Sequence, residues 1–252
     1  MELYDAIYSR KSIRSYDKKT VDDNLLKRIL EFASALVPLH GEQVEYRIIE
    51  RAQIKKTQAL FCPQAPYFLT LYSVLEEGCE ENAGYLMQQV SLYMTMKGLG
   101  SCFTGTLIQH DLVPGKVPLI TLAFGWAKTK HFYREEDAAD RLSMKTLCTI
   151  KEMPERAVLE VIKAARLAPS SFNSQPWRFV IYGSRVHIFY HCRNANKRKE
   201  ISRLNRVDMG IMLANFMLQA EKLWLETELV HLENIAEQEV KKNRYYITVR
   251  FL

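Results

Sequence analysis

The sequence predicts an α+β protein in which one order of helices and strands occurs twice. Helix-spaced apolar residues alternate along the chain with short apolar runs that are typical of strands. The order of helix, two strands, long apolar helix and strand is found in residues 1–150 and again in residues 151–252. We therefore predict two half-repeats with these bounds that together form one compact unit.

The elements of the first half follow from apolar spacing and end signals. Apolar residues at helical spacing predict a helix from Leu3 to Ile7, and another from Leu25 to Ala33 that starts after Thr20-Val-Asp-Asp. A long apolar helix is predicted over residues 82–97, and Gly98-Leu-Gly100 after it is a helix-end signal. Strands are predicted over residues 44–49, 67–73 and 117–126.

The second half is predicted in the same way. It comprises a helix over 157–167, a hairpin of strands 178–182 and 186–190, a long apolar helix over 208–225 and a last strand over 245–252. The halves also match at the residue level. The Pro38-to-Gln43 spacing resembles Pro169 to Gln175, and Ala83-Gly-Tyr-Leu-Met resembles Met209-Gly-Ile-Met-Leu. Chance similarity between two amphipathic segments is the alternative.

Composition excludes several classes of function. The net charge is +6, but the basic residues are spread along the chain, so no nucleic-acid partner is expected. The densest cluster, residues 197–206, is interpreted as a solvated surface; the alternative is a contact for the phosphates of a nicotinamide cofactor. No apolar run approaches the roughly 20 residues that cross a bilayer, so no membrane partner is expected.

Cysteine and histidine positions indicate reduced thiols and no metal. The five cysteines are scattered and include no C-x-x-C pair, which predicts a cytoplasmic protein without a disulfide frame. The histidines follow no ligand spacing, so no metal site is expected. The first residues predict an amphipathic helix instead of a signal peptide.

Two segments carry the functional information. One is Pro169-Ser-Ser-Phe-Asn-Ser-Gln-Pro-Trp177, and the other is Arg10-Lys-Ser-Ile-Arg14. Both resemble signature segments of the nitroreductase family, whose enzymes use bound FMN. In that family the two signals lie within a few tens of residues of each other, whereas here more than 150 residues separate them.

The resemblance implies a fused, pseudo-dimeric nitroreductase. Family homodimers bind flavin between subunits. The first half keeps the basic segment and the 98–105 loop, but Pro38-Leu-His-Gly-Glu42 has replaced its Pro-Ser loop. The second half keeps the 169–173 loop and lacks the other two parts. These complementary losses imply a three-layer sandwich made twice, a monomer acting as an internal pseudo-dimer, and one FMN per chain.

The resemblance also implies roles for particular residues. The phosphate would be bound by cationic and hydroxyl groups, because these form charge-assisted hydrogen bonds. Arg14 could instead contact the N1–C2 edge of the flavin ring. The alternative without a ligand is that this segment is a solvated helix end. A weaker phosphate candidate is Arg141, with Lys128, Lys130 and Arg134 as competitors. The main phosphate set is Arg10, Lys11, Ser12 and Arg14.

The remaining roles concern the ring and the ribityl chain. Short polar side chains in the 169–173 loop would meet them, and Asn173 is the candidate for the pyrimidine edge. Thr104 and Gly105 would lie near flavin N5, beside Cys102 and Phe103 as wall residues; a helix cap without ligand is the alternative. Gln175, Pro176 and Trp177 are expected to brace the loop. The expected loop contacts are Pro169, Ser170, Ser171 and Asn173.

The function implied is an FMN-dependent oxidoreductase with ping-pong hydride transfer. NAD(P)H would reduce the flavin, and a nitroaromatic, quinone or similar acceptor would reoxidise it. No side chain is expected to act as a catalytic acid or base, because flavin N5 carries the chemistry. Two alternatives stay open: a flavin-binding protein for storage or sensing, and a scaffold that has lost flavin.

Overall fold

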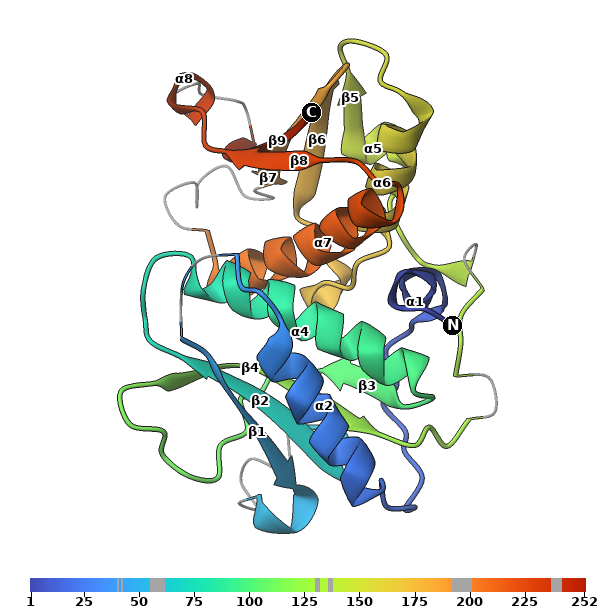
Figure 1. Cartoon of the computed structure of the whole chain (residues 1–252), viewed down its shortest axis with the longest axis vertical. Helices are drawn as coiled ribbons and strands as arrows, with labels where there is room; N and C mark the ends of the chain where they lie inside the picture. Colours follow the sequence, from blue (N-terminus) through green and yellow to red (C-terminus); the bar gives the residue numbers. More distant parts are fainter. Residues whose placement is uncertain are drawn as a thin grey trace. The chain divides into compact units, whose positions relative to one another are not determined.

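The computed structural model describes residues 1–39, 41, 43–54, 62–129, 132–135, 138–191, 201–236 and 242–252. The chain divides into two compact units, Met1–Ala139 and Asp140–Leu252 (Figure 1). This division precedes the expected boundary at residue 150. The reason is that β5 (Cys148–Ile150) pairs in parallel with β6 (Trp177–Tyr182) and so belongs to the second unit.

Unit 1 is built on a four-stranded antiparallel sheet in the order β1-β2-β4-β3. The register places Ile49 opposite Phe68 and Cys102 opposite Ala123. β2 is buried along its whole length, as expected for a central strand with both faces covered. The strands are β1 (Glu45–Glu50), β2 (Tyr67–Ser73), β3 (Gly100–Phe103) and β4 (Val117–Gly125).

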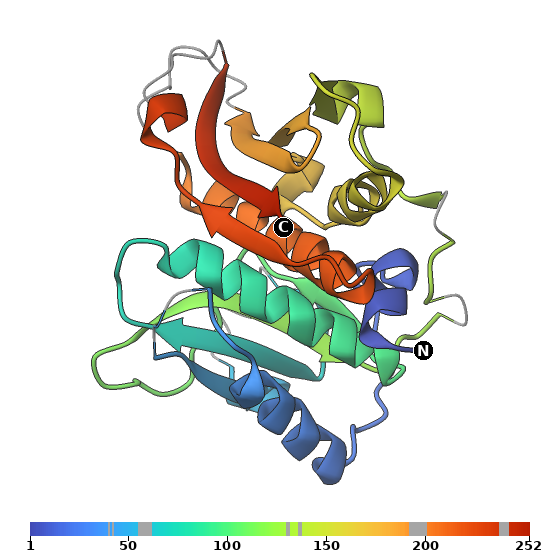
Figure 2. The same cartoon turned by 45° about the horizontal axis from the view of Figure 1, so that its top comes forward.

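Helices cover one face of this sheet. α2 (Asp23–Ala35) and α4 (Cys79–Met96) lie over it, and α1 (Leu3–Ser9) packs on α4 (Figures 1 and 2). The Asp22 side chain caps α2 by accepting a hydrogen bond from the Asn24 N–H. α4 ends at Met96, and Gly98 follows with a left-handed φ of 81°, the helix-end signal that the sequence predicted.

The other face of the unit 1 sheet is covered by extended segments. Phe68 and Ala123 of the sheet form an apolar cluster with Ile13, Tyr16 and Ile108. The Tyr16 hydroxyl donates to the Ala123 carbonyl at 3.1 Å, which ties the N-terminal segment to β4. The segment that follows α1 is therefore held in unit 1 by its own core.

Unit 2 is a five-stranded sheet in the order β5-β6-β7-β9-β8 with two main helices. β6 and β7 form the predicted hairpin. Helix α7 packs on α6, where the Asn215 amide donates to the Ala164 carbonyl, and on the sheet, where Phe216 stacks on Phe251. The elements not yet given are α5 (Met144–Leu147), α6 (Arg156–Arg166), β7 (Arg185–His191), α7 (Arg203–Lys222), β8 (Thr227–Val230), α8 (Glu233–Ala236) and β9 (Asn243–Phe251).

The two units repeat one topology. In each, a helix precedes two antiparallel strands, a long helix, an outer strand and a strand that pairs between the second and the outer one. The sheet order β1-β2-β4-β3 in unit 1 corresponds to β6-β7-β9-β8 in unit 2. The repeated order of elements inferred from the sequence is thus present in the fold.

Three local expectations need correction. The 98–105 segment is not a loop throughout, because Gly100–Phe103 pairs with β4 as the strand β3. Helix α7 begins at Arg203, five residues earlier than expected, because Ser202 caps a polar first turn by accepting from the Asn205 N–H. It ends at Lys222, and Trp224 follows with a left-handed φ of 56°.

Some expectations lie outside the described residues. These are the replacements at His40 and Glu42, Lys130, and residues 197–200 of the basic cluster at 197–206. Within the described part of the chain, no helix has the length and apolarity needed to cross a membrane. The described residues likewise include no group of His, Cys, Asp or Glu side chains that could hold a metal ion.

Candidate functional site

The basic segment of unit 1 lies directly beside β3. Arg10 ends α1, and its N–H donates to the Ala6 carbonyl at 2.8 Å. Ser12 then forms a parallel bridge with Ser101, and the Ile13 N–H donates to the Ser101 carbonyl at 2.9 Å. Two segments that the sequence assigned to one site are therefore joined by backbone hydrogen bonds.

Side chains of both segments meet at Cys102. Burial raises the pKa of this thiol, and the nearby positive charges of Arg14 and Arg10 and a hydrogen bond from Ser12 oppose the increase. Arg10 is buried, Ser12 is half-buried and Arg14 is exposed. Three of the four residues predicted to bind phosphate, Arg10, Ser12 and Arg14, therefore lie close enough to Cys102 on β3 to affect its pKa.

A glycine makes this close approach possible. A Cβ added at Gly100 would lie 2.8 Å from both Cβ and Cγ1 of Ile13. Real Cβ atoms do not tolerate such contacts, so Gly100 allows the basic segment to lie against the strand. The sequence pattern assigned this glycine to the end of the helix, and its packing role becomes visible only in the fold.

The donor chemistry of this region suits an anion. Of the residues that the structure describes, none forms an ion pair with Lys11 or Arg14. The competitor Arg134 instead donates to the Ile7 and Tyr8 carbonyls at the end of α1. Arginine and lysine side chains form strong charge-assisted hydrogen bonds with phosphate, so Lys11 and Arg14 are suitable donors for such a group.

Thr104 and Gly105 follow β3 directly. The Thr104 hydroxyl donates to backbone carbonyls, including that of Thr121 at 3.4 Å. Gly105 is exposed, and a Cβ added there would meet no atom within 4 Å. Its backbone therefore faces open space, which is compatible with the approach of a ligand but does not by itself require glycine.

In unit 2 the Pro169–Gln175 loop has an unusual backbone. Phe172, Asn173 and Gln175 have left-handed φ angles of 54°, 52° and 47°. Such angles are uncommon outside glycine, and they concentrate at functional sites. Phe172 lies at the tip with its side chain 95% exposed. These conformations persist only where the surrounding structure imposes them, so the loop is held in one shape.

Asn173 and Arg141 are joined in one hydrogen-bond network. The Arg141 guanidinium donates to the Asn173 Oδ1 at 3.1 Å and to the Leu167 carbonyl at 3.2 Å. The Asn173 amide donates to the Asp140 carboxylate at 3.0 Å. Burial lowers the pKa of Arg141, which nonetheless stays cationic. Both side chains thus have partners within unit 2, which braces the loop.

The sequence interpretation missed Asp208 of α7. Its carboxylate accepts hydrogen bonds from the Ser171 N–H and hydroxyl and from the Ser174 hydroxyl. The signal was an acidic residue inside an otherwise apolar helical run.

The bracing role expected for Gln175 and Trp177 is confirmed, because both are buried and the Gln175 Oε1 accepts from the Leu142 N–H at 2.7 Å.

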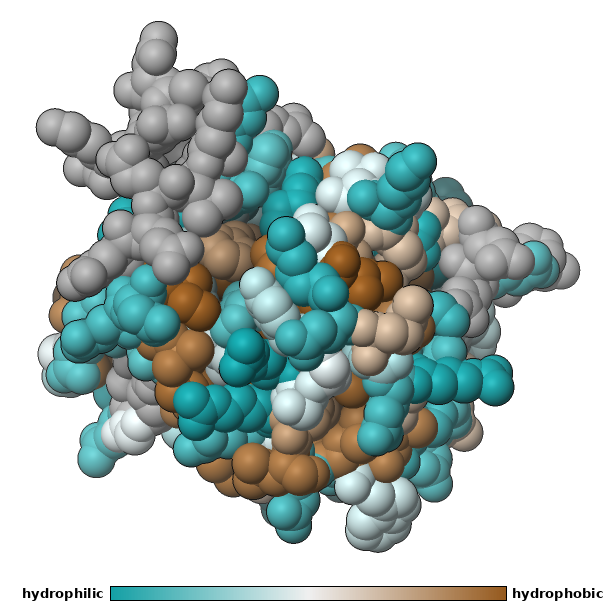
Figure 3. Space-filling model, turned by 90° about the horizontal axis from the view of Figure 1, so that it is seen from above, coloured by the Kyte–Doolittle hydropathy of each residue, from teal (hydrophilic) through white to brown (hydrophobic). Residues whose placement is uncertain are grey.

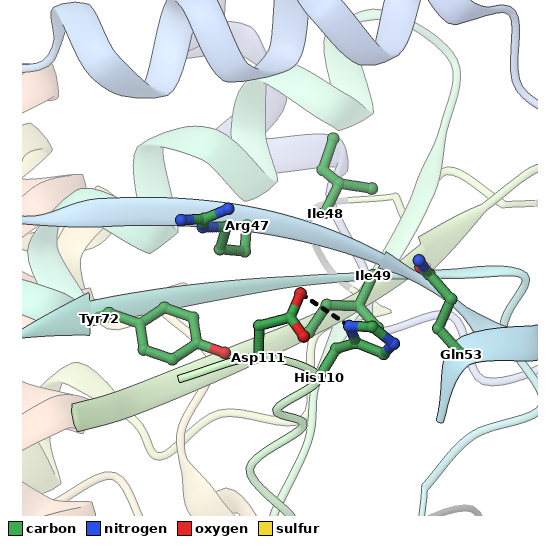
Figure 4. Close-up of a pocket in the computed structure, with 7 residues that line it drawn as sticks. All are labelled: Arg47, Ile48, Ile49, Gln53, Tyr72, His110 and Asp111. Atoms are coloured by element: carbon green, nitrogen blue, oxygen red, sulfur yellow. Dashed lines mark ion pairs between the residues drawn. The ribbon is translucent and has the colours of Figure 1, made fainter. Parts of the chain in front are cut away.

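A small polar pocket lies elsewhere in unit 1 (Figure 4). Its volume is about 90 Å³, room for only a few water molecules and too small for a flavin ring. His110 pairs with Asp111 at 2.9 Å, and Arg47 pairs with Glu45 at 2.6 Å. None of the predicted site residues lines it. The lining residues are Arg47, Ile48, Ile49, Gln53, Tyr72, His110 and Asp111.

Comparison with known families decides the identity of the chain. A family model described as "Putative TM nitroreductase" matches residues 2–220. The chain belongs to this nitroreductase family. A search of curated proteins found no match.

Solved structures agree with the nitroreductase fold. The chain is similar to a Thermotoga maritima protein described as a "putative nitroreductase", with 18% identity and a TM-score of 0.64 over 99% of this chain and 94% of that one. A nitroreductase family protein from Clostridium difficile 630 matches with 14% identity and a TM-score of 0.50, over 61% of this chain and 100% of that one. At these identities the likeness shows the fold alone.

A third structure has a lower score. An FMN-dependent nitroreductase from Clostridium difficile R20291 matches with 17% identity and a TM-score of 0.42, over 54% of this chain and 93% of that one. The recognition made from two short motifs is therefore confirmed. The family model over residues 2–220 shows the family, and the first two solved structures show the fold. These comparisons do not assign roles to individual residues, which are argued from the geometry of each unit.

Proposed function

We propose that this nitroreductase family member is an FMN-dependent oxidoreductase. The observation that carries the proposal is the gathering of Arg10, Ser12 and Arg14 around Cys102 on β3. This region offers cationic and hydroxyl donors at the place where the family resemblance expects the FMN phosphate. The donor set fits a phosphate monoester, which binds arginine through charge-assisted hydrogen bonds.

Each part of the chain then has a role. Arg10, Lys11, Ser12 and Arg14 hold the phosphate, and Arg14 has the N1–C2 edge of the ring as its alternative contact. Thr104 and Gly105 meet the ring near N5. In unit 2, the Ser170 hydroxyl accepts from the Gln175 N–H at 3.0 Å. This bond uses the oxygen as an acceptor, so the hydroxyl proton could donate to a ligand. The proposed loop and brace contacts are Pro169, Ser170, Ser171, Asn173 and Arg141.

FMN, when bound, supplies the redox chemistry by taking a hydride from NAD(P)H and passing electrons to a nitroaromatic, quinone or similar acceptor. The side chains bind and orient; none of them is assigned a proton transfer. A fixed guanidinium near the pyrimidine edge would favour the reduced form, because negative charge increases there on reduction. A storage or sensing protein that binds flavin without turnover is the alternative function.

Steady-state kinetics separate these two functions. If the chain is a two-step flavoenzyme, initial rates against NAD(P)H at several acceptor concentrations give parallel double-reciprocal lines. Anaerobic addition of NADH or NADPH bleaches the flavin absorbance. Intersecting lines contradict the ping-pong scheme, and absence of bleaching with both nicotinamides favours the binding protein.

The stoichiometry tests the proposal that the chain acts as an internal pseudo-dimer. We expect one FMN per 252-residue chain. Its binding site would be formed by the basic segment and the 169–173 loop, and the FMN should stay bound in a dilute monomer. The reason is that each motif occurs once in the sequence. Equilibrium titration with FMN and light scattering on the yellow species measure both quantities. Two flavins per chain, or flavin only in a dimer, would contradict this expectation.

A further inference from the structure

Asp208 is a buried carboxylate that binds the 169–175 loop with both oxygens. It is 1% exposed. Its Oδ1 accepts from the Ser171 N–H at 2.9 Å and from the Ser171 hydroxyl at 3.1 Å. Its Oδ2 accepts from the Ser171 N–H at 3.1 Å and from the Ser174 hydroxyl at 3.4 Å. An ionised carboxylate only accepts hydrogen bonds. All four of these hydrogen bonds are donated by Ser171 and Ser174 of the loop.

These hydrogen bonds bracket the strained part of the loop. Phe172 and Asn173, with φ of 54° and 52°, lie between the two serines that bind Asp208. A left-handed conformation at residues with side chains persists only where the surroundings impose it. Arg141 also contributes, because its guanidinium donates to the Asn173 Oδ1 and to the Leu167 carbonyl. The loop is therefore held by a buried anion and a half-buried cation.

Retaining this carboxylate lowers the stability of the fold at neutral pH. Burial raises the pKa of Asp208 to about 6, and the hydrogen bonds from Ser171 and Ser174 only partly oppose the increase. No charged side chain among the described residues contributes to this shift. Because the folded-state pKa is raised, the group's favourable contribution is complete below pH of about 4 and is lost as the pH rises through about 6.

We propose that Asp208 is the positioning residue of the Pro169–Gln175 loop, fixing the left-handed turn in the shape that meets the flavin. The anchoring of the loop stands on the contacts within unit 2. The effect on the flavin rests on the proposed function. Asp208 acts through Ser171 and Ser174 and is not assigned a contact with the ligand.

Amide hydrogen exchange tests the anchoring without flavin. In the full-length protein, Asp208→Ala should reduce the protection of the Ser171 amide by about tenfold to a hundredfold, as expected for loss of hydrogen bonds to a charged group. Chymotrypsin should cleave faster after the exposed Phe172. Asp208→Asn keeps one acceptor oxygen and should give an intermediate loss; it carries the test if the alanine variant does not fold.

Gln219→Met is the matched control. Gln219 is also buried on α7, about three helical turns beyond Asp208 and on nearly the same side. Its Oε1 has no hydrogen-bond partner among the described residues, so its removal should leave Ser171 protection unchanged. Unchanged protection in both Asp208 variants would overturn the proposal, as would an equal loss in the control.

The pH dependence tests in a second way whether the ionised carboxylate of Asp208 holds the loop. Between pH 7 and 5, protonation of Asp208 should raise the unfolding free energy of the wild-type protein. The same protonation removes an acceptor, so Ser171 protection should fall over that range. Asp208→Asn should show neither change at this site. Protection that is constant with pH in the wild type overturns the proposal.

Titration of the same variants with FMN separates the two proposals. Weaker FMN binding in Asp208→Ala, together with loss of Ser171 protection, supports the complete inference. Loss of protection with unchanged FMN affinity overturns the link to the flavin. If the wild-type protein binds no FMN, the proposed function fails and so does that link, while the exchange data still decide whether Asp208 anchors the loop.

Discussion

Replacing Gly100 with alanine is expected to weaken FMN binding more than tenfold and to lower the free energy of unfolding by about 1–3 kcal/mol, the usual cost of overpacking. The new Cβ would lie 2.8 Å from the Ile13 Cβ, an atom fixed to the backbone that no rotamer change can move away. The Ile13 N–H is itself bonded to Ser101. The basic segment must therefore move off β3, and the arginines move with it.

Equilibrium unfolding and FMN titration measure the two effects separately. Gly41→Ala is the control, because a Cβ there would meet no atom within 4 Å and the φ angle of Gly41 is not left-handed. This variant should match the wild type in both measurements. If Gly100→Ala binds FMN normally, the position of the Arg10–Arg14 segment against β3 does not matter for the ligand, and the proposed phosphate site is wrong.

Replacing Arg14 with glutamine is expected to lower FMN affinity by about 1.5–3 kcal/mol, the range for a hydrogen bond to a charged group. Arg14 is exposed, so the substitution removes a ligand contact with little loss of packing. Arg10 is a less clean test because it is 3% exposed, and its removal also leaves a cavity. Parallel titrations with FMN and riboflavin measure the effect.

The riboflavin titration distinguishes the two contacts proposed for Arg14. If the guanidinium binds the phosphate, riboflavin affinity should change much less than FMN affinity. If it binds the ring edge, both affinities should fall equally. Arg28→Gln is the control, since it removes the same charge from an exposed position on α2 of the same unit. No change with either ligand would remove Arg14 from the site.

Much of the fold could be predicted because its signals are local. The two long helices are indicated by apolar runs, and the end of the first of them is indicated by a single residue, Gly98. β3 and β8 could not be predicted in this way. Each has only four residues and depends on pairing with a strand that comes later in the chain. Short strands are specified by their partners more than by their own composition.

The candidate site, too, could be predicted only where its signals are local. Motif resemblance predicted that the basic segment and the glycine-rich segment belong together, and in unit 1 they do. It could not predict that Gly100 accommodates Ile13, because that contact joins residues distant in sequence. Asp208 was hidden for a similar reason, since its partners lie in a loop more than 30 residues earlier. Its presence in an apolar run was the only local signal.

The order of strands in each sheet has a consequence for synthesis on the ribosome. The outer strand of each unit, β3 or β8, has as its partner the strand made after it. Unit 1 has all of its strands once Gly125 has been added, before β6 exists. In unit 2, β9 joins β7 to β8 and supplies the Phe251 ring that stacks on α7. A nascent chain that stalls before Asn243 therefore carries a finished first sheet and an open second one whose unpaired edges invite aggregation.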